Sequence, residues 1–383
     1  MNFQPLKDFC DFYLPMLGVP MSDTVIYRNH EEIFRYSAGY DDPWLRTPTR
    51  RDALYNLYSC TKVATAVAAT QLIERGELLP SDPLYAYFPE YKDMTVKKTA
   101  PDGSVIVVPA EKPILIEHLL TMTSGMNYDL TAPSIAAVRQ STYGACPTLD
   151  IVRALAKEPL ESEPGEHYRY SLGLDVMGGV IELVSGLSLG EYMKRNIFDP
   201  LGMTETGFTM DERIVPRMAS QYRYNEETGA PEKIPVSENP YRFGTAYQSA
   251  GAGLISSVRD QILFADALAN MGKGKSGHRI LSPAGVDVLR ANRFDAAKLA
   301  EFPKYKFGYG YGYGVRTAID PKVKGNLASV GEFGWDGARR SYISADPERK
   351  LAVFHAEHMN FPNADSVIFA RLRNVIYACV ESD

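Results

Sequence analysis

The segment around which this fold is built is Leu57-Tyr58-Ser59-Cys60-Thr61-Lys62, which continues into the mostly apolar segment 63–75 and stops at Gly76. Ser59 and Lys62 are three residues apart, so a helix that opens at Ser59 places the hydroxyl and the amine on one face, within mutual reach. Segment 63–75 is apolar or small on all sides, with charge only in its last turn, which predicts a buried helix. Burial and the positive end of the helix both lower the pKa of Lys62 toward the range in which it accepts a proton from Ser59. The segment therefore predicts an activated serine nucleophile, or alternatively a capping serine followed by a lysine that reaches water.

The composition is that of an ordinary globular chain. Its 383 residues are 45% hydrophobic and 23% charged, enough for a large core or two subdomains. The net charge of −6 argues against a nucleic-acid or anionic-membrane partner. The sequence has neither a basic N-terminal segment followed by an apolar run nor an apolar run of about 18 residues, which predicts a cytoplasmic protein without a membrane span. The four cysteines lack metal or disulfide spacing and are expected to be reduced and structural.

The order of the predicted elements indicates an α+β chain. A helix over 5–14, ended by Pro15, precedes a β-hairpin whose strands cover 24–27 and 33–38. The middle of the chain is mainly helical, with helices predicted over 113–122, 149–157, 174–184, 189–198 and 260–271. Strands are predicted over 308–315, 341–345 and 351–356, and a helix over 365–380. We therefore expect one catalytic domain over 1–383, with a sheet-containing part at 1–79 and 278–383 and a mainly helical part at 80–277.

Two further segments carry candidate site residues. In segment 163–179 a Pro-Gly turn precedes Tyr170, in a loop just ahead of a helix; a tyrosine there can carry a proton if cationic neighbours lower its pKa. Segment 331–342 is a glycine-rich strand start that includes Trp335-Asp336-Gly337, where backbone can approach a ligand closely. A packing tyrosine and a simple strand bend are the alternatives.

Taken together, the three segments resemble the serine β-lactamase and penicillin-binding-protein superfamily, in the class C-like branch that includes family VIII carboxylesterases. Ser59-Cys60-Thr61-Lys62 is similar to its S-x-x-K motif, Tyr170-Ser171-Leu172 to Y-x-N or Y-S-x, and Trp335-Asp336-Gly337 to the W-x-G of such esterases in place of K-T-G. Segments 72–78, 118–125, 197–203 and 250–257 extend the resemblance over nearly the full length.

The resemblance implies a β-lactamase/transpeptidase-like fold, an antiparallel sheet flanked by helices, with the site between the sheet and the helical part. It implies that Ser59 attacks an acyl carbonyl while Lys62 and Tyr170 share the proton transfers. The backbone N–H groups of Ser59 and Ala338 would form the oxyanion hole. No metal or organic cofactor is expected, and the partner would be a small acyl ester or amide.

Departures from the family pattern bear on the substrate. Leu172 replaces the asparagine that holds a substrate amide in β-lactamases, and Trp335 replaces the lysine of K-T-G. Losing both polar anchors favours a carboxylesterase acting on short-chain or small acyl esters. The alternatives are a β-lactamase, a D-amino-acid peptidase or amidase, an acyltransferase using the same acyl-enzyme, or a catalytically inactive binding protein on this fold.

Two other motifs are given a structural interpretation. Gly186-Leu187-Ser188-Leu189-Gly190 matches the G-x-S-x-G nucleophile elbow, but a helix is predicted before it, where the elbow requires a strand. Ser188 is instead predicted to cap the next helix, with Glu191 completing a capping box. His355 and His358 form an H-x-x-H pair in or just after a strand, where residues three apart point to opposite faces, so we expect no metal site.

Arg339 and Arg340 follow Ala338 directly. If they lie on a strand, one guanidinium faces the groove and is expected to hold a substrate carboxylate through two hydrogen bonds. The alternative, which we favour, is a salt bridge to Glu332, Asp336 or another acid. Leu172, Trp335, Asp336, Gly337, Arg339 and Arg340 complete the predicted substrate-binding set.

Overall fold

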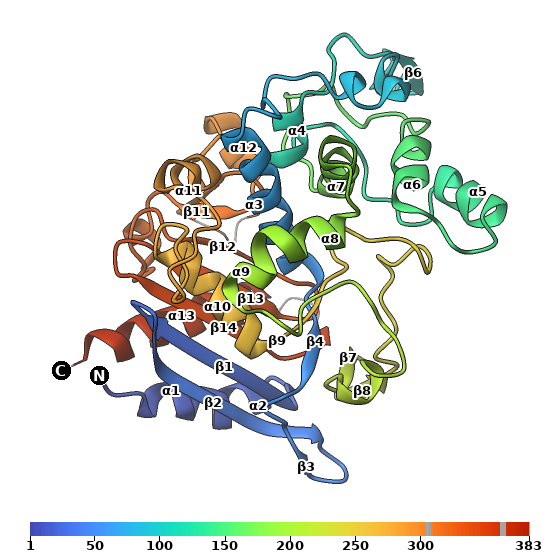
Figure 1. Cartoon of the computed structure of the whole chain (residues 1–383). Helices are drawn as coiled ribbons and strands as arrows, with labels where there is room; N and C mark the ends of the chain where they lie inside the picture. The colour runs from blue at the N-terminus through green and yellow to red at the C-terminus, as the bar shows by residue number, and fades with distance from the viewer. Residues whose placement is uncertain (304–305, 307, 361–364, 383) are drawn as a thin grey trace.

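An eight-stranded antiparallel sheet forms the centre of the computed structural model, which describes residues 1–303, 306, 308–360 and 365–382 (Figure 1). Its strand order is β10-β11-β12-β13-β14-β1-β2-β3. The strands are β1 (Met21–Arg28), β2 (Glu31–Asp42), β3 (Thr47–Pro48), β10 (Tyr309–Tyr311), β11 (Arg316–Ala318), β12 (Phe333–Asp336), β13 (Ser341–Asp346) and β14 (Leu351–Ala356). Because β1 pairs with β14, the two ends of the chain build one sheet, as predicted.

The β1–β2 hairpin is confirmed, with longer strands than predicted. Its turn consists of Asn29 and His30, both with positive φ (50° and 71°), which is the two-residue turn that matches the twist of a hairpin.

At the opposite end of the sheet the predicted strand 308–315 is wrong beyond Tyr311. Gly312 and Tyr313 leave the sheet there to bond Val315 and Leu289, and Gly314 has a φ of 65° that a strand does not tolerate.

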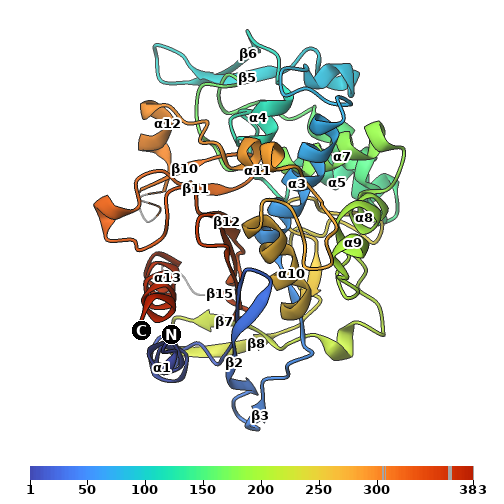
Figure 2. The same cartoon turned by 60° about the vertical axis from the view of Figure 1, so that its left-hand side comes forward.

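Helices cover both faces of the sheet (Figure 2). On one face lie α1 (Gln4–Asp8), a π turn η1 (Phe9–Tyr13), α2 (Leu14–Met16) and α13 (Asp365–Glu381). On the other face lie α3 (Thr61–Glu74), α10 (Val258–Ala269) and α11 (Pro283–Arg290). The N-terminal helix does not stop at Pro15 as predicted. The wider π turn before this proline relieves the clash its ring would make with the preceding turn, so the helix continues to Met16.

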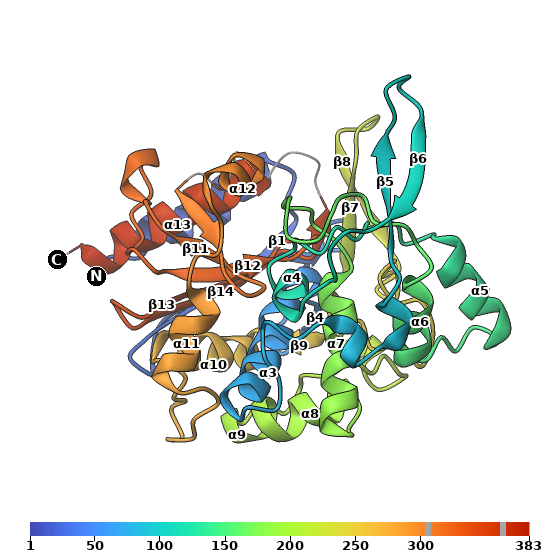
Figure 3. The same ribbon diagram turned by 90° about the horizontal axis from the view of Figure 1, so that it is seen from above.

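The middle of the chain forms a second region beside the sheet (Figure 3). Its predicted helices are present, within a few residues of their expected bounds, as α4 (Ile116–Leu120), α6 (Thr148–Leu155), α7 (Gly173–Ser185), α8 (Leu189–Met193) continued by the π turn η5 (Lys194–Phe198), and α10. The helices that were not predicted are α5 (Pro133–Ser141), α9 (Asp199–Leu201), α11 and α12 (Ala296–Glu301). The strands that were not predicted are β3, β11 and the small strands β4 (Leu54–Asn56), β5 (Thr95–Thr99), β6 (Val105–Pro109), β7 (Gln221–Asn225), β8 (Ala230–Ile234), β9 (Ile255–Ser257) and β15 (Met359–Asn360). α10 packs on β14, β1 and β13, although the sequence places it in the helical part.

In the part of the chain that the structure describes, no single helix is long and apolar enough to cross a membrane. One pair, Gly173–Ser185 with Leu189–Leu201, meets that length and composition only when taken together, across a bend of 76°. All four cysteines are buried and unpaired with one another, in agreement with their predicted structural role.

Candidate active site

Ser59 lies in a short 3₁₀ turn, Tyr58–Cys60, directly before α3, rather than inside the α-helix itself. Tyr58 has a φ of 48°, a strained conformation for a bulky residue. Its side chain holds that conformation, because the Tyr58 hydroxyl lies 2.9 Å from Gln221 Oε1 and 3.1 Å from the Glu238 carbonyl, either of which accepts its proton. The serine is therefore presented from a fixed, strained turn at the head of a buried helix.

Lys62 is fully buried one turn after Ser59, as the spacing predicts. Lys62 Nζ lies 3.2 Å from Ser59 Oγ and donates to the Gly251 carbonyl at 2.8 Å. Burial lowers the pKa of Lys62 to about 8, although the Asp175 carboxylate acts in the opposite direction. A large fraction of this amine is therefore neutral near pH 8 and able to accept the serine proton.

Asp175 and Gly251, which sequence analysis missed, complete the surroundings of Lys62. The Asp175 carboxylate accepts hydrogen bonds from the hydroxyls of Tyr247 (2.9 Å) and Ser249 (2.7 Å) and from the Gly251 N–H (3.2 Å). A Cβ at position 251 would overlap that carboxylate and approach Lys62 Nζ to 3.3 Å, so this position requires glycine. The network fixes a negative charge near the lysine without a direct ion pair.

Replacing Asp175 with Asn is expected to shift the pH profile of kcat/KM: its acidic limb, the rise in kcat/KM as the pH increases, should move to lower pH. The carboxylate raises the pKa of Lys62, so removing its charge lowers that pKa and leaves the amine neutral at lower pH. Tyr247→Phe, which removes one hydrogen bond to the same carboxylate but keeps its charge, should leave the limb in place. A limb that stays fixed or moves upward in Asp175→Asn would contradict this role for the carboxylate.

Tyr170 faces Lys62 from the loop before α7. Lys62 Nζ lies 4.8 Å from the centroid of the Tyr170 ring, and Trp335 Nε1 donates to the Tyr170 hydroxyl at 3.1 Å. The expected lowering of the tyrosine pKa is wrong. Burial raises the pKa of Tyr170, and the opposing hydrogen bonds with Ser59 and Trp335 do not cancel that effect. The phenol therefore stays protonated when Lys62 is neutral, which suits it to donate a proton.

The end of β12 and the residues directly after it line the same pocket as Ser59. Gly337 lies so close to the carbonyl of Leu57 and the hydroxyl of Ser341 that a Cβ there would overlap both. Ser341 Oγ also donates to the Leu57 carbonyl at 2.5 Å, which ties β13 to the turn before Ser59. This close approach brings Ala338 into the same pocket as the serine. The pocket, about 300 Å³ in volume, is lined by Ser59, Tyr168, Tyr170, Tyr241, Pro303, Lys306, Trp335, Asp336, Gly337 and Ala338.

Lys306 is a pocket residue for which the sequence offers no motif. Its ammonium lies 4.3 Å from the centroid of the Trp335 ring and forms a salt bridge with Asp336. The Asp336 carboxylate also accepts from Arg316 Nη1 at 2.9 Å, and these two cations hold its pKa below its usual value against the effect of burial. Asp336 therefore fixes Lys306 in the pocket wall.

Three predicted substrate-binding residues lie elsewhere. Arg339 and Arg340 occupy the turn between β12 and β13, not a strand. Arg339 donates to Tyr58 Oη (3.0 Å), the Tyr222 carbonyl (3.1 Å) and Glu238 (3.1 Å). Arg340 is fully buried and lies 3.4 Å from Glu357. The favoured salt-bridge alternative is thus confirmed, with acids that were not named, and the strand placement is wrong.

Leu172 also points away from the pocket. It is the residue before α7, is 1% exposed, and lines a separate small void with Met126, Asn127 and Leu155. The chain turns into the helix at this residue, so the side chain enters the apolar core instead of the groove. Position 172 therefore contributes no side chain to the serine pocket.

The remaining candidates have structural roles. Ser188 accepts from the Glu191 N–H at 3.3 Å, and Glu191 Oε2 accepts from the Ser188 N–H at 3.1 Å, so the predicted capping box is confirmed. His355 bonds Thr24 (2.7 Å) and Glu357 (3.0 Å), and burial lowers the pKa of His358 to about 3. Among the described residues, no group of three or more His, Cys, Asp or Glu side chains could hold a metal ion.

Comparison with known proteins agrees with this geometry. The model of the family described as Beta-lactamase matches residues 20–372. Esterase EstB from Burkholderia gladioli is 28% identical over 381 residues, covering 92% of this chain and 90% of EstB. Acyltransferase calJ from Penicillium decumbens is 32% identical over 274 residues, covering 69% of this chain and 63% of calJ.

Among solved structures, the chain is similar to "EstCE1, a hydrolase with promiscuous acyltransferase activity", with a TM-score of 0.77, 24% identity and coverage of 99% of this chain and 98% of EstCE1. This likeness shows a common fold. Together with the family match over most of the chain, it agrees with the resemblance carried by the three sequence motifs. The chain therefore belongs to the serine β-lactamase and penicillin-binding-protein superfamily and is an enzyme of the serine hydrolase type.

Proposed function

We propose that this enzyme is a carboxylesterase that forms an acyl-enzyme on Ser59. The observation that carries the proposal is the buried Lys62 amine, whose pKa is lowered to about 8 and which lies 3.2 Å from the Oγ of Ser59, a residue that lines the pocket. A neutral amine at that distance is a general base for the serine hydroxyl. The esterase relative EstB supports this choice of activity.

Acylation follows from the positions of the three side chains. Lys62 takes the Ser59 proton as Oγ bonds to the acyl carbon, and the carbonyl oxygen becomes an oxyanion. The backbone N–H groups of Ser59 and Ala338 are proposed to stabilise that charge, an effect worth several kcal/mol in such sites. When the ester C–O bond breaks, the leaving oxygen takes the proton of the neutral Tyr170 phenol.

Deacylation restores the starting protonation. The Tyr170 phenolate takes a proton from water, and the resulting hydroxide attacks the acyl carbon. As the bond between the acyl carbon and Ser59 Oγ breaks, Oγ recovers a proton from the Lys62 ammonium. The cycle uses no cofactor, so activity is expected to survive a chelator. An alcohol in place of water would give acyl transfer, which the relative calJ supports as a second activity.

The test is incubation with a fluorophosphonate probe and a panel of 4-nitrophenyl esters, followed by peptide mapping of the adduct. Labelling of Ser59 together with turnover of short-chain esters is the expected result. Labelling elsewhere, or no turnover of any ester, would refute the proposal.

Short-chain esters are expected to be turned over far better than penicillins or cephalosporins. Leu172 offers nothing to the pocket, and the Trp335 N–H is already bonded to Tyr170, so the two positions supply no amide or carboxylate anchor. The charge of Lys306 is balanced by Asp336. The measurement compares kcat/KM for 4-nitrophenyl butyrate and nitrocefin, and equal values would contradict the ester assignment.

A further inference from the structure

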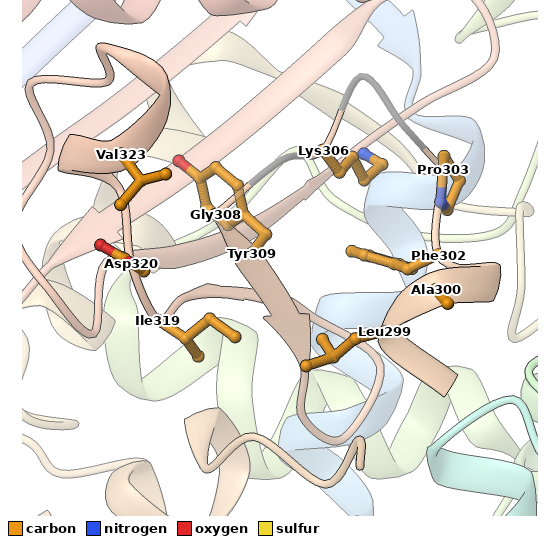
Figure 4. A pocket seen from close by; sticks show the side chains of 10 residues that line it. All are labelled: Leu299, Ala300, Phe302, Pro303, Lys306, Gly308, Tyr309, Ile319, Asp320 and Val323. Atoms are coloured by element: carbon orange, nitrogen blue, oxygen red, sulfur yellow. The ribbon is translucent and has the colours of Figure 1, made fainter. Parts of the chain in front are cut away.

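The serine pocket has two walls that differ in what lies behind them. Pro303 and Lys306 also line a second cavity of about 540 Å³, so on that side the pocket wall has a cavity at its back (Figure 4). Behind Ser59 and Ala338 lies a network of hydrogen bonds between buried side chains. The two proposed oxyanion donors thus belong to the wall that hydrogen bonds brace.

The side chain of Arg339 links the two donors. Arg339 follows Ala338 directly in the sequence, and its Nε donates to the hydroxyl of Tyr58 at 3.0 Å. Tyr58 is the residue directly before Ser59, in the strained turn that presents the serine. One side chain therefore connects the residue after one donor to the residue before the other.

The far end of the guanidinium is anchored to a third part of the chain. Arg339 Nη1 donates to the Tyr222 carbonyl on β7, and Nη2 donates to Glu238 Oε1, both at 3.1 Å. With the bond from Nε, each of the three nitrogens has an acceptor, and the side chain is 9% exposed. The planar guanidinium is thus held in one orientation, which the single nitrogen of a lysine could not reproduce.

Backbone bonds shape the turn that carries Ala338. The Arg340 N–H donates to the Gly337 carbonyl at 2.8 Å, and the Met359 N–H donates to the Arg339 carbonyl at 3.1 Å. Ala338 is exposed between the buried residues Gly337 and Arg339. The turn therefore presents Ala338 to the pocket, and the guanidinium ties this turn to the serine turn.

We infer that Arg339 is a positioning residue for the oxyanion hole, which sets the separation between the N–H groups of Ser59 and Ala338. The inference rests on the proposed acyl-enzyme and extends it to a residue that touches neither substrate nor the reacting atoms. Oxyanion donors act on charge that develops in the transition state, so a change in their separation slows the reaction with little effect on ground-state binding. A displacement of about 1 Å is enough to cost about 100-fold in rate.

The experiment compares Arg339→Met and Arg339→Lys with Arg35→Met as the matched control. Arg35 is also a largely buried arginine, with 8% of its side chain exposed, but it lies on β2 and bonds Asp23 (2.6 Å) and the Arg51 carbonyl (3.3 Å). The measurements are the burst rate and kcat with 4-nitrophenyl butyrate, Tm, and Ki for propyl trifluoromethyl ketone. The adduct of this ketone with Ser59 carries an oxyanion.

Arg339→Met should lower the burst rate and kcat alike by about 10- to 100-fold, because acylation and deacylation both form an oxyanion. KM should change little, since the two steps slow together. Ki for the ketone should rise by about the factor by which kcat/KM falls, because the adduct uses the same two N–H groups. Arg339→Lys should not restore the wild-type rate, and Arg35→Met should lower Tm but leave kcat and Ki as in wild type.

Tyr58→Phe tests the link itself, because it removes the hydroxyl that Arg339 bonds. If Arg339 acts through this bond, the double variant Tyr58→Phe/Arg339→Met should lose little more activity than Arg339→Met alone. Losses that multiply would show that the two residues act independently and would overturn the inference. If Arg339→Met does not fold, Arg339→Lys and Tyr58→Phe with their double variant carry the same comparison.

Wild-type kcat and Ki in the Arg339 variants, or a fall in kcat with an unchanged Ki, would overturn the positioning role while the acyl-enzyme stands. Probe labelling of Ser59 in wild type tests the acyl-enzyme separately. A wild type that hydrolyses no ester and takes no label at Ser59 would refute the proposed function, and the inference with it.

Discussion

Ser59→Ala is expected to abolish probe labelling and to lower kcat for ester hydrolysis by on the order of 10⁴-fold or more, the loss seen when a serine nucleophile is removed from a working site. The effect is large because, among the described residues that line this pocket, Ser59 carries the one aliphatic hydroxyl on which Lys62 and Tyr170 can act. The measurement is burst and steady-state kinetics with 4-nitrophenyl butyrate, alongside intact-mass detection of the probe adduct.

Ser188→Ala is the matched control, since it removes the serine of the competing G-x-S-x-G motif. Ser188 caps α8, so its loss should leave kcat unchanged and reduce the free energy of unfolding by about 1 kcal/mol. A probe adduct on Ser188, or full activity in Ser59→Ala, would remove Ser59 from the mechanism.

The sheet and the site core could be predicted because their signals are local. A spacing of three residues fixes how Ser59 and Lys62 lie on a helical turn, and alternation or apolar runs mark β13 and β14. The errors occur where an irregular backbone turn or a tertiary contact overrides the local pattern. The helix runs through Pro15 because a π turn precedes it, and the glycine-rich strand ends at Tyr311 because the chain must bond Leu289.

The missed site residues have no motif because the fold brings them in from distant parts of the chain. Gly251 and Asp175 meet Lys62 only through tertiary packing, and Lys306 reaches the pocket next to Trp335. Arg339 illustrates the reverse case. Its position after a site motif places it in the predicted substrate-binding set, but the favoured alternative holds: it forms a salt bridge, with Glu238, and it bonds Tyr58, so it supports the strained turn that presents the serine. The cytoplasmic location stays a prediction.

The second large effect is expected from Lys62→Ala and Tyr170→Phe, each of which should lower kcat by orders of magnitude with little change in KM. Both groups act on proton transfer and not on binding of the ground state. Their roles differ in protonation: Lys62 must be neutral, with a pKa of about 8, and Tyr170 must be protonated, with a pKa raised above its ordinary value of 10.

The pH dependence separates the two roles. In wild type, kcat/KM should rise about tenfold per pH unit below pH 8, as Lys62 loses its proton, and stay level to about pH 10, where Tyr170 is still protonated. The residual activity of Tyr170→Phe should keep the rise below pH 8, because Lys62 is intact. The residual activity of Lys62→Ala should lose it. If Tyr170→Phe loses the rise and Lys62→Ala keeps it, the phenol is the base and the assignment of the two proton transfers must be exchanged.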